Sequence, residues 1–270
     1  MPTAWRSPNG IRRATTVEFH EYLWRGVMAS DVPIRLCGVT YEVGTATLVR
    51  DLSFEVDAAE TVVLLGRSGS GKTTALRLIN HLLMPTRGEV IVEGRRTTDW
   101  DPIQLRRRIG YVIQEVGLFP HFTVARNISL VPTLEGWEAE RVEARTSELL
   151  DKVGLPTEVL SRYPDQLSGG QRQRVGVARA LAADPPVLLM DEPFGALDPI
   201  TRADIQREFL SVQETLGKSI LFVTHDLREA LLLGNRIGLM DQGRLVWMGT
   251  PDEFRESPDP HVVDFRESLA

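Results

Sequence analysis

The sequence predicts an α/β fold with a mainly parallel sheet that is interrupted by a helical insertion. Short apolar runs alternate with helical stretches along most of the 270 residues, one run ends directly in a glycine-rich loop, and residues 116–183 contain no good strand. Strands of a parallel sheet are covered by helices on both faces, so they read as continuous apolar runs. The length fits one large domain, or one domain with an inserted lobe.

In the N-terminal stretch, residues 1–30, the apolar residues show neither helical nor strand periodicity. Met28 lies just before the first predicted strand. We expect an N-terminal extension without fixed structure, with Met1 or Met28 as the start of the protein. Residues 31–255 are expected to form the main domain, with its helical part at about 116–183. Residues 256–270 are expected to form a short tail.

The first predicted strand, 33–43, carries the single cysteine of the sequence, Cys37. One cysteine cannot form an internal disulfide, which suits a reducing compartment. A half-buried strand cysteine is expected here rather than a catalytic thiol, because free cysteines are commonly buried.

Further apolar runs predict strands at 61–66, 89–94, 110–114, 186–191, 219–225 and 236–243. Two of the helices between them are predicted at 72–83 and 101–110. The second has Asp101 as a plausible N-cap and Pro102 at its first position, where proline is favoured.

The composition excludes several classes of protein. A net charge of −6 argues against general nucleic-acid binding but leaves room for a local phosphate site. No apolar run approaches the roughly 18 residues of a membrane span, and the N-terminus lacks the apolar core of a signal peptide. We therefore expect a cytoplasmic protein whose connection to a membrane goes through a partner.

The strongest motif is GRSGSGKTT at residues 66–74, between a predicted strand and a predicted helix. A phosphate needs backbone N–H groups at close range and a helix N-terminus behind them, so glycines are useful where side chains would obstruct. Lys72 offers a charge to the β- and γ-phosphates, and Thr73 offers a hydroxyl to Mg²⁺. The residues expected to bind the phosphates are Gly66, Arg67, Ser68, Gly69, Ser70, Gly71, Lys72, Thr73 and Thr74.

A second motif, PVLLMDEP at 186–193, ends an apolar strand in two carboxylates. Asp191 is expected at the carboxyl end of the strand, where open α/β sheets bind ligands, and it can hold Mg²⁺. Glu192 is placed to polarise a water. A D-E pair alone is more often a solvated turn, but the glycine-rich loop upstream favours the functional interpretation.

The third motif is LSGGQRQR at 167–174, at the mouth of a predicted helix. Ser168 with Gly169 and Gly170 can form an anion site at a helix N-terminus. Alternatively, Ser168 only caps the helix. The chain then has two candidate phosphate loops and only one nucleotide-binding strand–loop–helix unit.

The three motifs in this order closely resemble those of the ABC transporter ATPases, over about residues 32–250. The resemblance implies a P-loop NTPase (RecA-like) core with an antiparallel β subdomain and an inserted helical subdomain. It also implies that two subunits enclose two ATP molecules. Each ATP then contacts the glycine-rich loop of one subunit and Ser168, Gly169, Gly170 and Gln171 of the other.

Four further residues match the family's motifs. Tyr41 fits the aromatic residue that stacks on adenine, although an ordinary strand tyrosine remains an alternative. The resemblance implies that Gln114 contacts Mg²⁺ and the attacking water, that Asp198 lies at the dimer interface, and that His225 contacts the γ-phosphate. Glu192 is then the general base or water-orienting group, and ATP closes the dimer until hydrolysis releases it.

The segment 101–137 looks like the ATPases of osmoprotectant importers, which carry glycine betaine, choline, carnitine or proline. The expected partners are a second, identical ATPase subunit, integral-membrane permease subunits and, indirectly, a substrate-binding protein, with no nucleic acid. The surface near 114–122 is expected to dock a short permease helix at the cytoplasmic face of the membrane. Some of these ATPases continue into CBS domains, which residues 250–270 do not suggest. An importer ATPase for an amino acid or alkyl sulfonate, or a soluble ABC ATPase, remains an alternative.

Overall fold

The structure, a computed structural model, describes residues 32–195 and 197–268. The chain divides into two units, Met1–Asp31 and Val32–Ala270, and the account below concerns the second. The expectation of an N-terminal extension at residues 1–30 lies outside the described residues. In the described part of the chain, no helix is long and apolar enough to cross a membrane.

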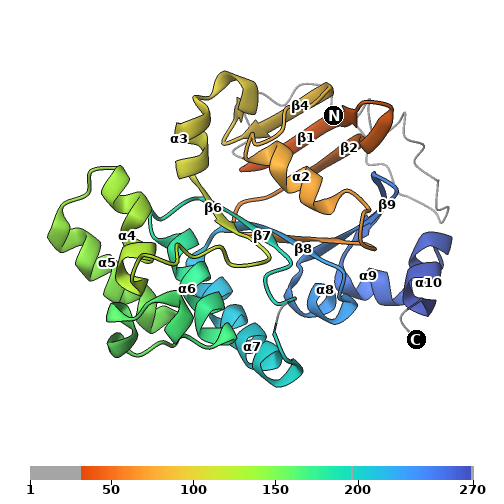
Figure 1. Cartoon of the computed structure of the whole chain (residues 1–270). Helices are drawn as coiled ribbons and strands as arrows, with labels where there is room; N and C mark the ends of the chain where they lie inside the picture. The colour runs from red at the N-terminus through yellow and green to blue at the C-terminus, as the bar shows by residue number, and fades with distance from the viewer. Residues whose placement is uncertain (1–31, 196, 269–270) are drawn as a thin grey trace, which may run out of the picture. The chain divides into compact units, whose positions relative to one another are not determined.

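The larger sheet has the strand order β10-β9-β3-β8-β7-β6 (Figure 1). Its strands are β3 (Thr61–Leu65), β6 (Ile109–Val112), β7 (Val187–Asp191), β8 (Ser219–Thr224), β9 (Arg236–Asp241) and β10 (Arg244–Gly249). All neighbouring pairs are parallel except β9 with β10. The prediction of a mainly parallel sheet is therefore confirmed, and β10 adds an antiparallel edge that the sequence analysis did not predict.

The smaller sheet is antiparallel, with the order β2-β1-β4-β5. Its strands are β1 (Ile34–Val43), β2 (Ala46–Val56), β4 (Arg87–Val92) and β5 (Arg95–Arg96). Inward side chains of this sheet share a hydrophobic core with helix α2 (Lys72–Ile79) and with one face of the larger sheet. This sheet is the expected antiparallel subdomain, and Cys37 lies half-buried on β1 as expected.

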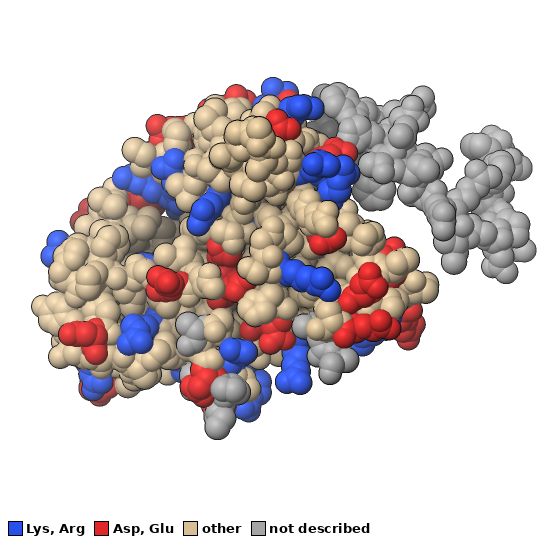
Figure 2. All heavy atoms as spheres, turned by 45° about the vertical axis from the view of Figure 1, so that its right-hand side comes forward, with Lys and Arg blue, Asp and Glu red and all other residues tan. Residues whose placement is uncertain are grey.

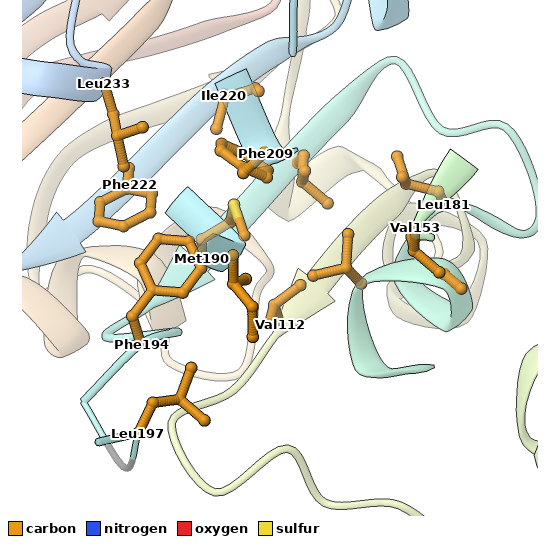
Figure 3. Packing of buried hydrophobic residues seen from close by; sticks show 14 of the residues in the cluster. Val112, Val153, Leu181, Met190, Phe194, Leu197, Phe209, Ile220, Phe222 and Leu233 are labelled. Atoms are coloured by element: carbon orange, nitrogen blue, oxygen red, sulfur yellow. The ribbon is translucent and has the colours of Figure 1, made fainter. Parts of the chain in front are cut away.

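Successive side chains along a strand of the larger sheet point to opposite faces of the sheet. In β7, Val187 and Leu189 face the core shared with the smaller sheet, whereas Leu188 and Met190 face a second core. That second core contains packed aromatic rings, with the centroids of Phe194 and Phe222 5.7 Å apart (Figure 3). All five residues of β7 are buried, and because both faces of the sheet are covered, the four residues before Asp191 form an unbroken apolar run.

The remaining helices surround these sheets or form the insertion. They are α3 (Pro102–Arg107), α4 (Val124–Leu134), α5 (Ala139–Lys152), α6 (Gly169–Leu181), α7 (Pro199–Leu216), α8 (Leu227–Leu233), α9 (Pro251–Glu256) and α10 (Pro260–Glu267). Short 3-10 helices lie at Thr97–Asp99, Thr157–Ser161 and Pro164–Gln166. Every residue from 116 to 183 is described and none belongs to a strand, so the insertion between β6 and β7 is helical, as predicted. The outer domain limits at residues 30 and 255 stay predictions.

Two details of the predicted helices can be compared with the structure. Asp101 caps α3 as predicted, because its side chain accepts hydrogen bonds from the N–H groups of Ile103 and Gln104. The helix predicted at 72–83 is too long, since α2 ends at Ile79. His81 has a φ of +55° there, which turns the chain out of the helix.

The charged side chains are interspersed on the face of the molecule that Figure 2 presents, with Lys and Arg among Asp and Glu. Several of them form exposed ion pairs, such as that between Arg96 and Glu89 at 2.9 Å. Exposed pairs of this kind add little to stability. We therefore attribute most of the stability of the fold to the two hydrophobic cores.

Candidate active site

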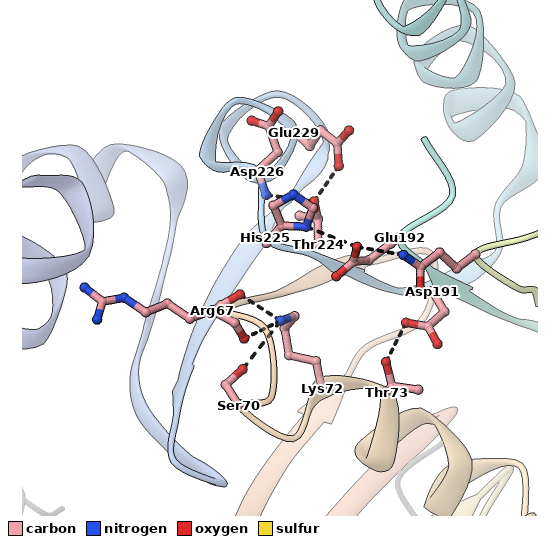
Figure 4. A network of polar contacts seen from close by, with 12 residues as sticks. Arg67, Ser70, Lys72, Thr73, Asp191, Glu192, Thr224, His225, Asp226 and Glu229 are labelled. Carbon is pink, nitrogen blue, oxygen red and sulfur yellow. Dashed lines mark hydrogen bonds and ion pairs between the residues drawn. The ribbon is translucent and has the colours of Figure 1, made fainter. Parts of the chain in front are cut away.

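The glycine-rich loop connects β3 to α2 and folds around the side chain of Lys72. The ammonium group donates hydrogen bonds to the carbonyl oxygens of Gly66 at 2.7 Å and Arg67 at 2.9 Å (Figure 4). Lys72 is 4% exposed. Burial lowers the pKa of Lys72, and the carboxylates of Glu192 and Asp191 act against this shift. The loop therefore fixes a cation at its centre, with two carboxylates nearby.

The glycines of this loop are required for two different reasons. A Cβ at Gly66 would lie 2.4 Å from the carbonyl oxygen of Met240, so the fold has no room for one. Gly69 has open space around it but a φ of +80°, and Gly71 has a φ of +100°. Gly71 is the N-cap of α2 and provides no side-chain cap. The first N–H groups of α2 are therefore available to an anion, and the cradle fits a phosphate.

A hydroxyl and a carboxylate meet beside the loop. The Thr73 hydroxyl donates a hydrogen bond to Oδ1 of Asp191 at 2.9 Å, and the Tyr111 hydroxyl lies 3.5 Å from Oδ2. Burial raises the pKa of Asp191 and raises the pKa of Tyr111 to about 12. Hydroxyl and carboxylate oxygens are the ligands that Mg²⁺ prefers, so Thr73 and Asp191 fit a magnesium ion held together with phosphate.

Two predicted catalytic side chains, those of His225 and Gln114, converge on the third, Glu192. Its Oε2 lies 3.1 Å from Nδ1 of His225 and 3.4 Å from Nε2 of Gln114, whose amide donates to it. Glu192 has a φ of +44°, and its N–H donates to the carbonyl of Val223. The chain thus leaves β7 in a sharp turn directly after Asp191. The carboxylate of Asp191 therefore contacts Thr73, whereas that of the next residue, Glu192, contacts His225 and Gln114.

The loop that carries His225 is connected by hydrogen bonds to a buried carboxylate, that of Glu229, which the sequence analysis did not predict. The Thr224 hydroxyl donates to Oε2 of Glu229 at 2.5 Å and accepts a hydrogen bond from the N–H of Asp226. Glu229 is 3% exposed, and Gln206 on α7 donates to its other oxygen. Burial raises the pKa of Glu229. The sequence carried no signal for this role, since a glutamate in a short helix is ordinarily on a solvated face.

The other predicted residues lie apart from this centre. Ser168 and Gln171 form a capping box at the start of α6, in which the Ser168 hydroxyl accepts from the N–H of Gln171 and the Gln171 amide oxygen accepts from the N–H of Ser168. Tyr41 is half-buried on β1 and packs against the core of the smaller sheet. Asp198 is exposed directly before α7. The side chain of Arg67 points away from Lys72 (Figure 4).

Sequence comparisons connect this site with known proteins. The profile of the ABC transporter family matches residues 49–195. The chain is 49% identical, over 82% of its length, to the glycine betaine/carnitine/choline transport ATP-binding protein of Bacillus subtilis, and covers 58% of that protein. It is 52% identical, over 80% of its length, to the osmoprotectant import ATP-binding protein of Salmonella typhimurium, and covers 56% of it. The chain thus spans little more than half the length of these two relatives.

A third relative is closer in length to this chain than the first two. The glycine betaine uptake system ATP-binding protein of Escherichia coli is 50% identical over 77% of the chain, which covers 68% of it. Among solved structures, a dimeric ATP-binding cassette in a post-hydrolysis state with ADP and Pi superposes with a TM-score of 0.72 at 34% identity, over 81% of this chain and 98% of that one. A cassette from Clostridium perfringens, part of an ABC transporter complex, superposes with a TM-score of 0.77 at 25% identity, over 89% and 96% of the two chains. The predicted P-loop NTPase fold is confirmed.

Proposed function

Because the chain belongs to the ABC transporter family, we propose that it binds ATP with Mg²⁺ and hydrolyses ATP to drive an importer of osmoprotectants. The observation that carries the hydrolytic part is the convergence of Gln114 and His225 on one oxygen of Glu192. A carboxylate held by two polar side chains, next to a buried lysine and a magnesium-type oxygen pair, is suited to orienting a water toward a γ-phosphate.

Each side chain has a distinct part in this proposal. The loop at 66–74 and Lys72 bind the phosphates. Thr73 with Asp191 and Gln114 would hold Mg²⁺, which would supply positive charge beside the phosphoryl group. Glu192 accepts a proton from the attacking water or aligns it. His225 contacts the γ-phosphate and keeps the Glu192 carboxylate in place from the neighbouring strand.

We further propose that the working unit is a dimer of this chain. The hydrogen bonds described for the side chains of Ser168 and Gln171 are those of their own capping box, and a Cβ added at Gly169 would have its nearest neighbouring atom 3.8 Å away. The N-terminal end of α6 is thus open to a ligand. ATP bound to a second copy fits this position, and the neighbour bound to ADP and Pi is itself dimeric. Asp198 would then lie at the dimer contact.

The proposed connection to the membrane is a groove beside the segment 114–122. It has a volume of about 350 Å³, and its lining includes Arg106, Ile113, Phe119 and Val131. Phe119 is 40% exposed. An apolar groove with basic residues at its side suits a short amphipathic helix, which we assign to a permease subunit. The chain would thereby be held at the cytoplasmic face of the membrane, with a substrate-binding protein as an indirect partner.

The proposed cargo class is the quaternary amines and related osmoprotectants. Its support is the relatives, of which one is named for glycine betaine, carnitine and choline transport and another for osmoprotectant import. The test is to purify the chain from membranes with its permease, reconstitute both in vesicles and measure ATP-driven uptake. Uptake of labelled glycine betaine, choline, carnitine or proline is expected. Uptake of an amino acid other than proline or of an alkyl sulfonate instead would reject this cargo, and recovery of ribosomes or DNA without a permease would reject transport.

A further inference from the structure

The turn that follows Gln114 has an unfavourable backbone conformation. Val116 has a φ of +57° and Gly117 a φ of +55°. A left-handed conformation is common for glycine, but for a β-branched residue it is an outlier. Such strain persists only where the surroundings determine the conformation, and it concentrates at functional sites. The structure must therefore hold Val116 in place from outside the turn.

The first holding contact is Arg179 on α6. Its guanidinium group donates to the carbonyl oxygen of Val116 at 2.6 Å and to that of Gly117 at 2.7 Å. In residues 32–195 and 197–268, no carboxylate pairs with Arg179. Burial lowers the pKa of its guanidinium group. A planar guanidinium with two fixed donors suits two successive carbonyls. The Arg179 side chain therefore binds the backbone of the turn.

The second contact is steric and lies one helical turn earlier. A Cβ at Gly176 would meet Cγ1 of Val116 at 2.5 Å. Gly176 and Arg179 are three residues apart and therefore lie on the same face of α6. Glycine in the middle of a helix is unfavourable, and here its place is explained by the Val116 side chain that packs directly on the backbone of the helix.

We infer that Arg179, with the bare backbone of Gly176, is a positioning residue that holds the turn 115–117 and thereby sets where the Gln114 amide meets Glu192. Gln114 directly precedes this turn, and its amide lies 3.4 Å from Glu192. The turn is joined by Arg179 to α6, the helix that Ser168 caps. The inference rests on the proposed function in ATP hydrolysis. It means that a shift of α6 moves the Gln114 side chain relative to Glu192.

The sharpest test is Gly176→Ala, because alanine strengthens the helix while its Cβ displaces Val116. We expect kcat for ATP to fall about 10- to 100-fold, the scale of a misplacement of about 1 Å, with the KM for ATP and the thermal stability retained. Adding Val116→Ala removes the clashing Cγ1 and should return kcat to the level of Val116→Ala alone. If Gly176→Ala has the kcat of the wild type, the inference is wrong.

A second test replaces the donors with Arg179→Met, which keeps an unbranched side chain. The matched control is Arg174→Met, because Arg174 lies on the same helix and donates to the carbonyls of Val153 and Gly154. Amide hydrogen exchange in residues 115–118 should increase only in the Arg179 variant, and kcat should fall only there. In a Gln114→Ala background, Arg179→Met should cause no further fall, because the two changes act through one group.

An equal fall of kcat in both backgrounds would show a general structural effect and overturn the inference, as would unchanged exchange in residues 115–118. The exchange measurement needs no hydrolysis. If the wild-type dimer with its permease hydrolysed no ATP, the proposed function would fail on that result, while the exchange data would still decide whether Arg179 holds the turn.

Discussion

Oε2 of Glu192 and Nδ1 of His225 lie 3.1 Å apart at the ends of two neighbouring parallel strands, β7 and β8. The contact joins a carboxylate to an imidazole across 33 residues of sequence. It keeps the Glu192 side chain above the loop that holds Lys72, instead of leaving it free at the surface.

Replacement of this carboxylate should separate binding from hydrolysis. Glu192→Gln keeps the size of the side chain but cannot accept a proton, so kcat should fall about 10²- to 10⁴-fold. The affinity for ATP, measured by equilibrium binding, should be unchanged because the phosphates are bound by other groups. The exposed Glu140 offers a control, and Glu140→Gln should behave as the wild type. Normal turnover in Glu192→Gln would exclude it as the base.

The hydroxyl of Thr73 should control the requirement for magnesium. Thr73→Val preserves the shape but removes the oxygen that bonds Asp191, and we expect the Mg²⁺ concentration for half-maximal hydrolysis to rise about 10- to 100-fold. Thr73→Ser keeps the hydroxyl and should stay near the wild type. A magnesium titration of ATP hydrolysis checks both variants, and equal behaviour of the valine and serine variants would contradict the assignment.

Ser168 allows the helix-cap and anion-site interpretations to be separated. Aspartate caps helices as well as serine does, so Ser168→Asp should retain stability, but its charge should repel a phosphate held by the partner copy and suppress hydrolysis. Ser168→Ala should lose about 1 kcal/mol of cap stability.

The matched control is Thr250, which forms the same capping box at α9. Thr250→Ala should lose a similar amount of stability, about 1 kcal/mol, without a change in kcat. Denaturant unfolding and ATPase assays on the same preparations give both readouts. Wild-type hydrolysis by Ser168→Asp would leave Ser168 as a cap alone.

The buried Glu229 should make stability depend on pH. Burial raises its pKa in the folded state above the ordinary value, so in the interval between the two values the folded state binds more protons than the unfolded state. The free energy of unfolding therefore falls as the pH rises through this interval. Its contribution is fully present below the ordinary pKa of about 4.3 for glutamate.

Glu229→Gln removes this titration, so the difference in unfolding free energy between variant and wild type should grow in favour of the variant with rising pH. Urea unfolding across the acidic to neutral range measures it. The pKa of Asp191 is also raised by burial, but Asp191 is common to both proteins, so its contribution cancels in the difference. A pH-independent difference would contradict the prediction.

Alanine should have different effects on stability and ATP binding at a glycine without room for a side chain and at a glycine that only has a positive φ. At Gly66 an added methyl group meets a main-chain carbonyl, which cannot move aside cheaply, so Gly66→Ala should abolish ATP binding and destabilise the fold. Gly44 has open space and a φ of +59°, so Gly44→Ala should cost only backbone strain, about 1–2 kcal/mol, and leave ATP binding intact. Similar effects at both positions would show that sterics at the loop are not decisive.

Local signals in the sequence predicted most of the parallel sheet and the centre of the site. The loop at 66–74 is recognisable because the glycines and Lys72 act within nine consecutive residues. Asp191 follows an apolar run that is buried on both faces. In both cases the chemistry depends on neighbours in sequence, which a single sequence displays.

Other features depend on contacts between distant segments and carried no local signal. Strand β10 is an exception, because its apolar run Leu245–Met248 was a local signal that the sequence analysis did not use. The turn at Val116 is held by Arg179, 63 residues away. The buried carboxylate of Glu229 accepts a hydrogen bond from Gln206 on α7, 23 residues earlier in the sequence. The functional relationships of Tyr41 and Asp198, and the dimer, stay predictions.

The order of strands in the larger sheet also has a consequence for synthesis of the protein. The two neighbours of β3 are β8 and β9, and β8 begins at Ser219, about 150 residues after β3 ends at Leu65. At about 5–20 residues per second, a ribosome needs roughly 8–30 s to supply that partner strand. During this interval the apolar TVVLL segment that leads into the nucleotide loop has no edge to pair with. The centre of the sheet therefore cannot close around β3 until β8 and then β9 have been synthesised.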